Sequence, residues 1–265
     1  MHRLLLAASL LVSATLAAPL DQNESTKITY GYAVDVAAAT STATFSCYGQ
    51  QNYRVAFVQI YQPINDGMPN PNGPTNIQNA VNAGLGVEVF VTPSLTGGKQ
   101  GYEQLDEAYN YVTSRGVNVK SIWLQVTSPI NWPSNQQNNA NFIYSFLTRA
   151  QQRNLGVGIY TNAYDWMQIT SGWTGWSQIP GGVRLWYWHV TTTGPAGQTD
   201  PTFNDFTPFS GFYDPLVKQY AQYIYICSTN VNINVYKVSN KQAPEAKEIA
   251  DGKPVVGLLM GSDRQ

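Results

Sequence analysis

Short runs of β-branched and aromatic residues recur along the chain and alternate with segments of helical spacing. Eight runs have the length of a strand, and they cover residues 30–36, 54–61, 85–91, 119–126, 156–161, 183–189, 220–227 and 231–236. Strands that alternate with helical segments imply parallel pairing and an α/β fold. About eight strands in one chain of this size favour a single closed (β/α) barrel over a doubly wound sheet.

Three of the intervening segments carry apolar residues at helical spacing, near residues 77–81, 105–112 and 142–150. No glycine-rich phosphate-binding motif follows a strand, which disfavours a nucleotide-binding α/β protein. In (β/α) barrels the functional residues lie at the carboxyl ends of the strands. The candidate site residues are therefore sought there.

Composition narrows the choice of partner. The chain has 15 Lys+Arg against 16 Asp+Glu, whereas it has 22 Asn and 20 Gln. So few charges of such even balance argue against nucleic acid and anionic membranes as partners. They leave neutral polymers such as glycans open.

The two ends of the chain differ from the middle. Residues 1–17 have a basic start, an apolar run and small residues before Ala18, which predicts a cleaved signal peptide and a secreted protein. A polar segment follows at residues 18–29, and Asn23 lies there in a glycosylation sequon. Residues 237–265 hold nine charges in 29 positions, which predicts a mobile charged tail after a barrel of residues 30–236. No continuous apolar stretch after the signal is long enough to span a bilayer.

Cys47 and Cys227 are the two cysteines. An oxidising secretory compartment favours a disulfide between them, which would tie the first structural unit to the last. The alternative is a pair of free buried thiols.

Polar residues stand near the ends of three predicted strands. Asp35 lies inside an apolar run of the first strand, where an acid needs a partner or a task. Gln125 and Thr127 are two positions apart near the end of the fourth strand, so they point the same way. Asn232 lies in the last strand.

These segments resemble the lysozymes of glycoside hydrolase family 25, in particular the protist-type branch. The matching stretches are 30–36, 41–47, 122–124, 157–161, 185–187, 209–211, 217–220 and 231–236. The resemblance implies an irregular (β/α) barrel that cleaves peptidoglycan between N-acetylmuramic acid and N-acetylglucosamine, without metal or cofactor. It also implies that Asp35 is a catalytic acid. The family's fourth strand normally ends Asp-x-Glu, and its last strand normally reads Val-Asp-x-Asn. Gln125, Thr127 and Asn232 replace those three acids.

Glycosidic cleavage needs a proton donor for the leaving oxygen and a second group that stabilises or attacks the sugar carbon. An amide or a threonine hydroxyl cannot supply the acid, and general acid catalysis alone contributes about 10²–10⁴-fold. The three replacements therefore predict weak or absent hydrolysis. They retain polar groups that bind sugars, and Tyr160, Trp186 and Trp188 are candidate faces for sugar rings, with core packing as the alternative.

Two other readings of the site stay open. Glu88, Asp165 or Asp66 is a possible relocated acid, although each also fits a solvated charge or a cap. His189, the only histidine after the signal, fits a hydrogen-bonded structural residue better than a base, and no cluster of metal-ligand spacing accompanies it.

The sequence thus predicts a secreted lysozyme-like protein of antibacterial defence that acts on or binds peptidoglycan or a related glycan. One alternative is an active muramidase that uses Asp35 and a relocated acid. The other is a non-catalytic interaction or signalling protein on the same scaffold. The sequence leaves the oligomeric state open.

Overall fold

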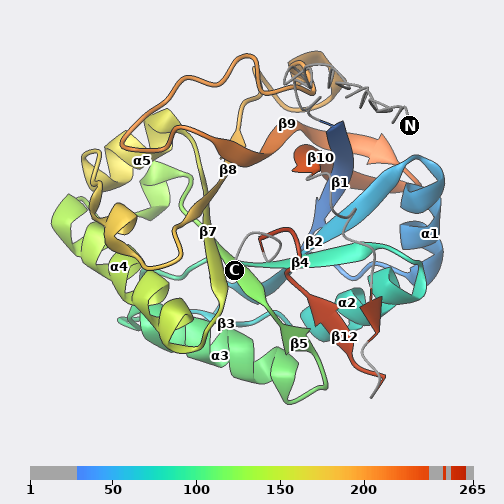
Figure 1. The fold of residues 1–265 in the computed structure, drawn as a ribbon, viewed down its shortest axis with the longest axis horizontal. Helices are drawn as coiled ribbons and strands as arrows, with labels where there is room; N and C mark the ends of the chain where they lie inside the picture. The colour runs from blue at the N-terminus through green and yellow to red at the C-terminus, as the bar shows by residue number, and fades with distance from the viewer. Residues whose placement is uncertain (1–28, 239–246, 249–251, 261–265) are drawn as a thin grey trace, which may run out of the picture.

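The computed structural model describes residues 29–238, 247–248 and 252–260. The predicted signal peptide, Asn23 and much of the predicted tail lie outside these residues. Within them, eight strands close into one barrel (Figure 1). In order around the barrel these strands are β1 (Thr29–Val36), β2 (Tyr53–Gln62), β4 (Gly86–Val91), β6 (Ser121–Gln125), β7 (Gly156–Thr161), β8 (Arg184–Trp188), β9 (Pro215–Ile226) and β10 (Thr229–Val238).

The barrel is irregular at one place. Neighbouring strands from β1 to β9 run parallel, whereas β10 is antiparallel to both β9 and β1. The predicted single (β/α) barrel is confirmed, because all eight predicted strands are present and the sheet closes between β1 and β2. A short strand, β3 (Met68–Pro69), adds to the end of β2.

Helices surround the barrel in Figure 1. They are α1 (Thr42–Gln50), α2 (Gly73–Asn82), α3 (Gly101–Thr113), α4 (Gln136–Gln152) and α5 (Ala163–Thr170), with 3₁₀ turns at Pro129–Asn131, Gly175–Gln178 and Pro195–Gly197. The helices α2, α3 and α4 were predicted, whereas α1 and α5 were not. Each of these two has a side-chain N-cap: Ser41 accepts from the Thr44 amide and Asn162 accepts from the Asp165 amide. Within the described chain, no α-helix lies between β8 and β9, only the 3₁₀ turn at Pro195–Gly197. A long connection covers that side instead (Figure 1).

Alternate residues of each strand face two different cores. The outer core lies between the strands and the helices. The inner core fills the barrel with large side chains, among them Phe57, Trp123, Trp186 and Tyr236. The barrel is therefore packed along its axis and is not a pore, and a ligand can reach it only at an end.

The end at the amino termini of the strands, which we call the floor, is closed by the chain itself. The strand β12 (Pro254–Val256) pairs with β5 (Asn118–Val119) on one side and with β11 (Lys247–Glu248) on the other. Met260 is buried in the inner core. At Gly257, φ is +84° and a Cβ would lie 2.4 Å from the Ser121 nitrogen, so only glycine fits this close approach. The mobile-tail prediction is therefore wrong for residues 252–260, because their apolar side chains find a place under the barrel.

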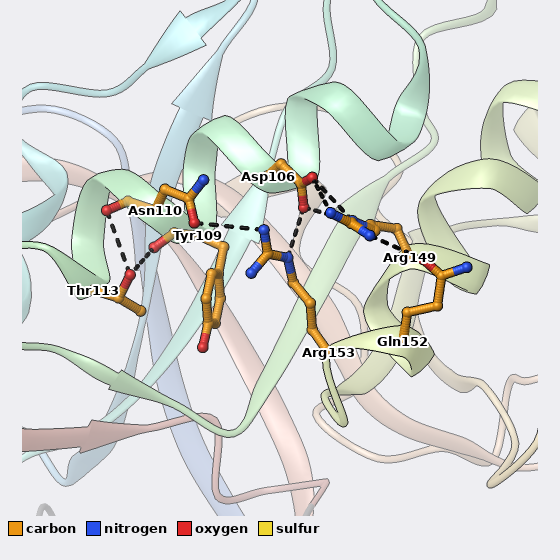
Figure 2. Close-up of polar contacts among 7 residues, drawn as sticks. All are labelled: Asp106, Tyr109, Asn110, Thr113, Arg149, Gln152 and Arg153. Carbon is orange, nitrogen blue, oxygen red and sulfur yellow. Dashed lines mark hydrogen bonds and ion pairs between the residues drawn. The ribbon is translucent and has the colours of Figure 1, made fainter.

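Outside the barrel, α3 and α4 are joined by ion pairs (Figure 2). Asp106 on α3 accepts hydrogen bonds from Arg149 on α4 and from Arg153, the residue that caps the end of α4. The Arg153 guanidinium also lies 4.5 Å from the centre of the Tyr109 ring.

No helix in the described part of the chain is long and apolar enough to cross a lipid bilayer.

Candidate functional site at the barrel mouth

The carboxyl ends of the parallel strands meet at the other end of the barrel, which we call the mouth. Asp35 lies there on β1, directly across the ladder from Asn232 on β10. The Asp35 carboxyl accepts hydrogen bonds from three side-chain amides: Asn232 at 2.9 Å, Asn234 at 2.9 Å and Gln219 at 2.8 Å. Asp35 and Asn232, two of the four site positions that the resemblance implies, are thus brought together, with two further amides around Asp35.

The environment of Asp35 favours its neutral form. Burial raises the pKa of this carboxyl above its usual range, although the hydrogen bonds from the three amides act in the opposite direction. A carboxyl with a raised pKa keeps its proton to higher pH than a surface aspartate.

Gln125 and Thr127 lie in a second polar group at the mouth. The Gln125 amide donates to the Thr127 hydroxyl at 2.9 Å, and its carbonyl accepts from the Thr92 hydroxyl at 2.6 Å. This series of hydrogen bonds continues through Gln59, which donates to Thr92, and through Asn70, which donates to Gln59. Every residue in this hydrogen-bonded network is neutral. The network therefore fixes the orientation of the Gln125 amide but offers no acid at the fourth-strand positions.

Sequence reasoning missed the residues that support Asp35 from beneath. Gln219 accepts from the Tyr160 hydroxyl at 2.9 Å and from the Gln222 amide at 2.6 Å. Asn234 accepts from the Trp186 indole at 2.9 Å. A signal for Asn234 was present, because it lies two positions after Asn232 and so shares its face of the strand.

The three aromatic candidates have different roles. Trp186 is fully buried, and its ring is stacked on Tyr160 with the ring centres 4.1 Å apart. The prediction that Trp186 offers a face to sugars is therefore wrong, since its ring is enclosed by other aromatic side chains of the inner core. Tyr160 is also buried and uses its hydroxyl to hold Gln219. Trp188 remains partly exposed, and its indole donates to Asp165 at 3.0 Å.

Of the candidate relocated acids, Asp165 has the relevant place. It is buried in the first turn of α5, immediately after β7, and burial raises its pKa against the hydrogen bonds from Trp188 and the Ser128 backbone. Glu88 faces the floor, where the backbone of Leu259 donates to it, so it cannot serve the mouth. Asp66 is exposed on a surface loop and accepts from the Thr96 hydroxyl, as expected of a solvated charge.

His189 belongs to a cluster on the outer side of the barrel. Its ring contacts the Asp205 carboxylate at 2.6 Å, and the buried Lys218 donates to the same carboxylate at 2.7 Å. Lys218 also donates to the carbonyls of Asp200 and Thr202. The cluster fastens the long connection between β8 and β9, which agrees with the expected structural histidine.

Cys47 on α1 and Cys227 at the end of β9 form the predicted disulfide. Within the described residues, no group of three or more His, Cys, Asp or Glu is arranged to hold a metal ion.

A closed (β/α) barrel with an aspartate held by side-chain amides at the carboxyl ends of its strands defines a barrel protein with a polar site at its mouth. The sequence matches the family described as Lysozyme-like protein 1 over residues 26–220. "Lysozyme-like protein 7" of Caenorhabditis elegans is 43% identical over 249 residues, which cover 93% of this chain and 87% of that protein. "Probable GH family 25 lysozyme 2" of Dictyostelium discoideum is 32% identical, over 77% of this chain and 89% of its own. The chain therefore belongs to the lysozyme-like proteins of glycoside hydrolase family 25.

Solved structures agree on the fold. A family GH25 lysozyme from Aspergillus fumigatus aligns with a TM-score of 0.58 at 9% identity, over 81% of this chain and 97% of that one. A bacterial lysozyme from Streptomyces coelicolor aligns with a TM-score of 0.56 at 16% identity, over 79% and 93% of the two chains. At these identities the likeness concerns the barrel and not the chemistry of the mouth.

Proposed function

We propose that this protein is a secreted lysozyme-like protein of antibacterial defence that binds peptidoglycan or a related glycan at the barrel mouth, with weak or no muramidase activity. Family membership supports a peptidoglycan-related function. The proposal for secretion depends on the signal sequence of residues 1–17.

One observation carries the loss of catalysis. The three side chains that hold Asp35 are amides. The hydrogen-bonded network that contains Gln125 and Thr127 has only neutral members. A glycosidase needs a proton donor and a second group acting on the sugar carbon, and two carboxyls usually share this work. Asp35 supplies one of them. The positions that would supply the second hold groups that hydrogen-bond sugar hydroxyls and N-acetyl groups without transferring a proton.

Sedimentation with purified, insoluble peptidoglycan tests the binding. We expect the wild-type protein to pellet with the polymer and Asp35→Ala to pellet less, because the variant leaves the amides of Asn232, Asn234 and Gln219 without their acceptor. Asp214→Ala is the matched control, since this acid is exposed and lies before β9, away from the mouth. Wild-type protein that stays in the supernatant with walls from several kinds of bacteria would favour the interaction or signalling role on the same scaffold.

Asp165 supports one second candidate, an active muramidase in which Asp35 works with a relocated acid. Its burial at the mouth and its raised pKa are properties of a general acid. A cell-wall clearing assay decides between the two. We expect no clearing above background. Clearing that disappears in both Asp35→Ala and Asp165→Asn would establish the muramidase.

A further inference from the structure

The β9–β10 hairpin continues beyond the barrel mouth. The last pair that β8 makes with β9 is Trp188 with Gln219, and β1 pairs with β10 only as far as Asp35 with Asn232. The two hairpin strands go on pairing with each other up to Ile226 and Thr229. The outer part of the hairpin therefore stands next to Asp35 without a further strand on either side.

Strand register shows which face of the hairpin continues the site. Asn230 is two residues from Asn232, so both lie on the face that carries the amide bonded to Asp35. Tyr225 is paired with Asn230 and shares that face. Ile224 and Val231, the adjacent pair, face the other way and belong to the outer core. Tyr225 thus extends the face of the candidate site, and its side chain is 70% exposed.

Tyr223 connects this face directly to the site. Its backbone N–H donates to the Asn232 side-chain oxygen at 3.1 Å, and the Asn232 amide donates to Asp35. Tyr223 has a φ of +55°, which is uncommon for a bulky residue, and it lies where the register between β9 and β10 shifts. Its side chain is 66% exposed. Two tyrosines therefore offer their rings to solvent beside the amide that holds Asp35.

The turn of the hairpin is tethered to α1. Its two turn residues, Cys227 and Ser228, both have positive φ, as a tight hairpin of this kind requires. Neither is a glycine, and the turn is held instead by the disulfide to Cys47. The Thr229 hydroxyl also bonds the Tyr48 hydroxyl on the same helix. A fixed surface loses little conformational entropy when a ligand binds.

The chemistry of this face selects a neutral ligand. No Asp, Glu, Lys or Arg occurs from Gln219 to Tyr236, and the exposed residues of this segment are Tyr223, Tyr225, Ser228 and Asn230. Two residues of a strand span roughly 7 Å, which is of the order of one sugar ring along a glycan. Tyrosine offers an apolar face together with a polar tip, and this combination suits the mixed faces of a sugar.

We propose that Tyr223 and Tyr225 form an outer subsite that holds a β-1,4-linked N-acetylhexosamine chain where it leaves the Asp35 site. This inference rests on the proposed glycan-binding function and adds a length requirement to it. Short oligomers occupy the mouth alone, whereas longer ones also contact the hairpin.

Calorimetric titration with the disaccharide and the hexasaccharide of N-acetylglucosamine tests the subsite. We expect wild-type protein to bind the hexasaccharide more tightly, and Tyr225→Ala to lower that affinity by about 3- to 10-fold with no change for the disaccharide. Tyr225→Phe keeps the ring and should stay near the wild type. Tyr213→Ala is the matched control, because this tyrosine is 77% exposed but precedes β9 at the floor end.

The outcomes separate the two proposals. If the wild type binds neither oligomer and does not pellet with peptidoglycan, the proposed function fails and the subsite fails with it. If the wild type binds and Asp35→Ala weakens both oligomers, the glycan-binding function stands. The subsite is then overturned if Tyr225→Ala equals Tyr213→Ala on the hexasaccharide, or if the wild type does not distinguish the two lengths. Tyr225 is exposed, so a thermal melt should show this variant folded.

Discussion

The two ends of the barrel each enclose a carboxyl group with neutral hydrogen-bond donors, but they use different donors. At the mouth, Asp35 accepts from three side-chain amides. At the floor, Glu88 accepts from the Trp123 indole at 2.9 Å, the Ser121 hydroxyl at 3.2 Å and the backbone of Leu259 at 2.8 Å. The donor from Leu259 belongs to the segment that closes the floor. An acid covered by its own chain is structural, whereas an acid surrounded by side-chain amides at the open end is available to a ligand.

Burial raises the pKa of both acids, and it raises that of Glu88 to about 7. The two acids therefore differ in their access to a ligand and in their hydrogen-bond donors, and not in the direction of their pKa shifts. Four experiments test this comparison, in order of the effect that we expect.

Restoring the three acids should change the mouth most. In the triple variant Gln125→Asp, Thr127→Glu and Asn232→Asp, we expect cell-wall clearing to rise from background by at least about 10²-fold, because a proton donor and an electrostatic stabiliser return together. The measurement is the release of reducing sugar from purified peptidoglycan. A folded triple variant that remains inert would show that the positions of the catalytic acids are wrongly assigned.

Removing a side chain from the floor should lower stability without touching the mouth. Met260→Ala leaves a cavity in the inner core and should reduce the free energy of unfolding by about 2–5 kcal/mol. Denaturant unfolding measures this loss, and Met167→Ala serves as the control because Met167 is exposed. Equal stability of the two variants would mean that the C-terminal segment does not close the floor. Peptidoglycan sedimentation of folded Met260→Ala should match the wild type.

Titration of Glu88 at the floor should make the free energy of unfolding depend on pH. Its folded-state pKa of about 7 lies above the usual value of 4.5, so the folded protein holds this proton more tightly than the unfolded chain. The resulting stability is fully present below about pH 4.5 and is lost as the pH rises through 7, by an amount on the order of 3 kcal/mol. Asp35 acts in the same direction.

Unfolding curves from pH 4 to pH 8 measure this slope. In Glu88→Gln the free energy of unfolding should change less steeply with pH. A loss of stability that the substitution causes equally at every pH does not affect this slope. An unchanged slope would assign the pH dependence to other groups.

The barrel was predictable because each strand carries its own local signal. The resemblance assigned Asp35 and Asn232 to one site, but nothing in the sequence predicted that they pair directly. The helix α1 gave no such signal, because its Thr, Ser and Gly residues lack a strong apolar face. The role of Trp186 was wrong because an aromatic residue in a strand has the same pattern whether it lines a cleft or fills a core. The position of Met260 depends on contacts with strands far away in the sequence, and no local pattern encodes them.

The smallest effect concerns a carboxyl outside the barrel, Asp106. Burial opposes its ionisation, but the hydrogen bonds and charges of Arg149 and Arg153 outweigh it and lower the pKa of Asp106 (Figure 2). Its contribution to stability is therefore present above the usual pKa of 3.8 and is lost as the pH falls, opposite in sign to that of Glu88. Because the ion pairs are partly exposed, Asp106→Asn should cost only about 1 kcal/mol at pH 7. The difference between this variant and the wild type should shrink as the pH falls below 4 and should decrease with added salt. A difference that instead grew toward low pH would mean that neutral contacts, and not the arginines, decide the charge state of this acid.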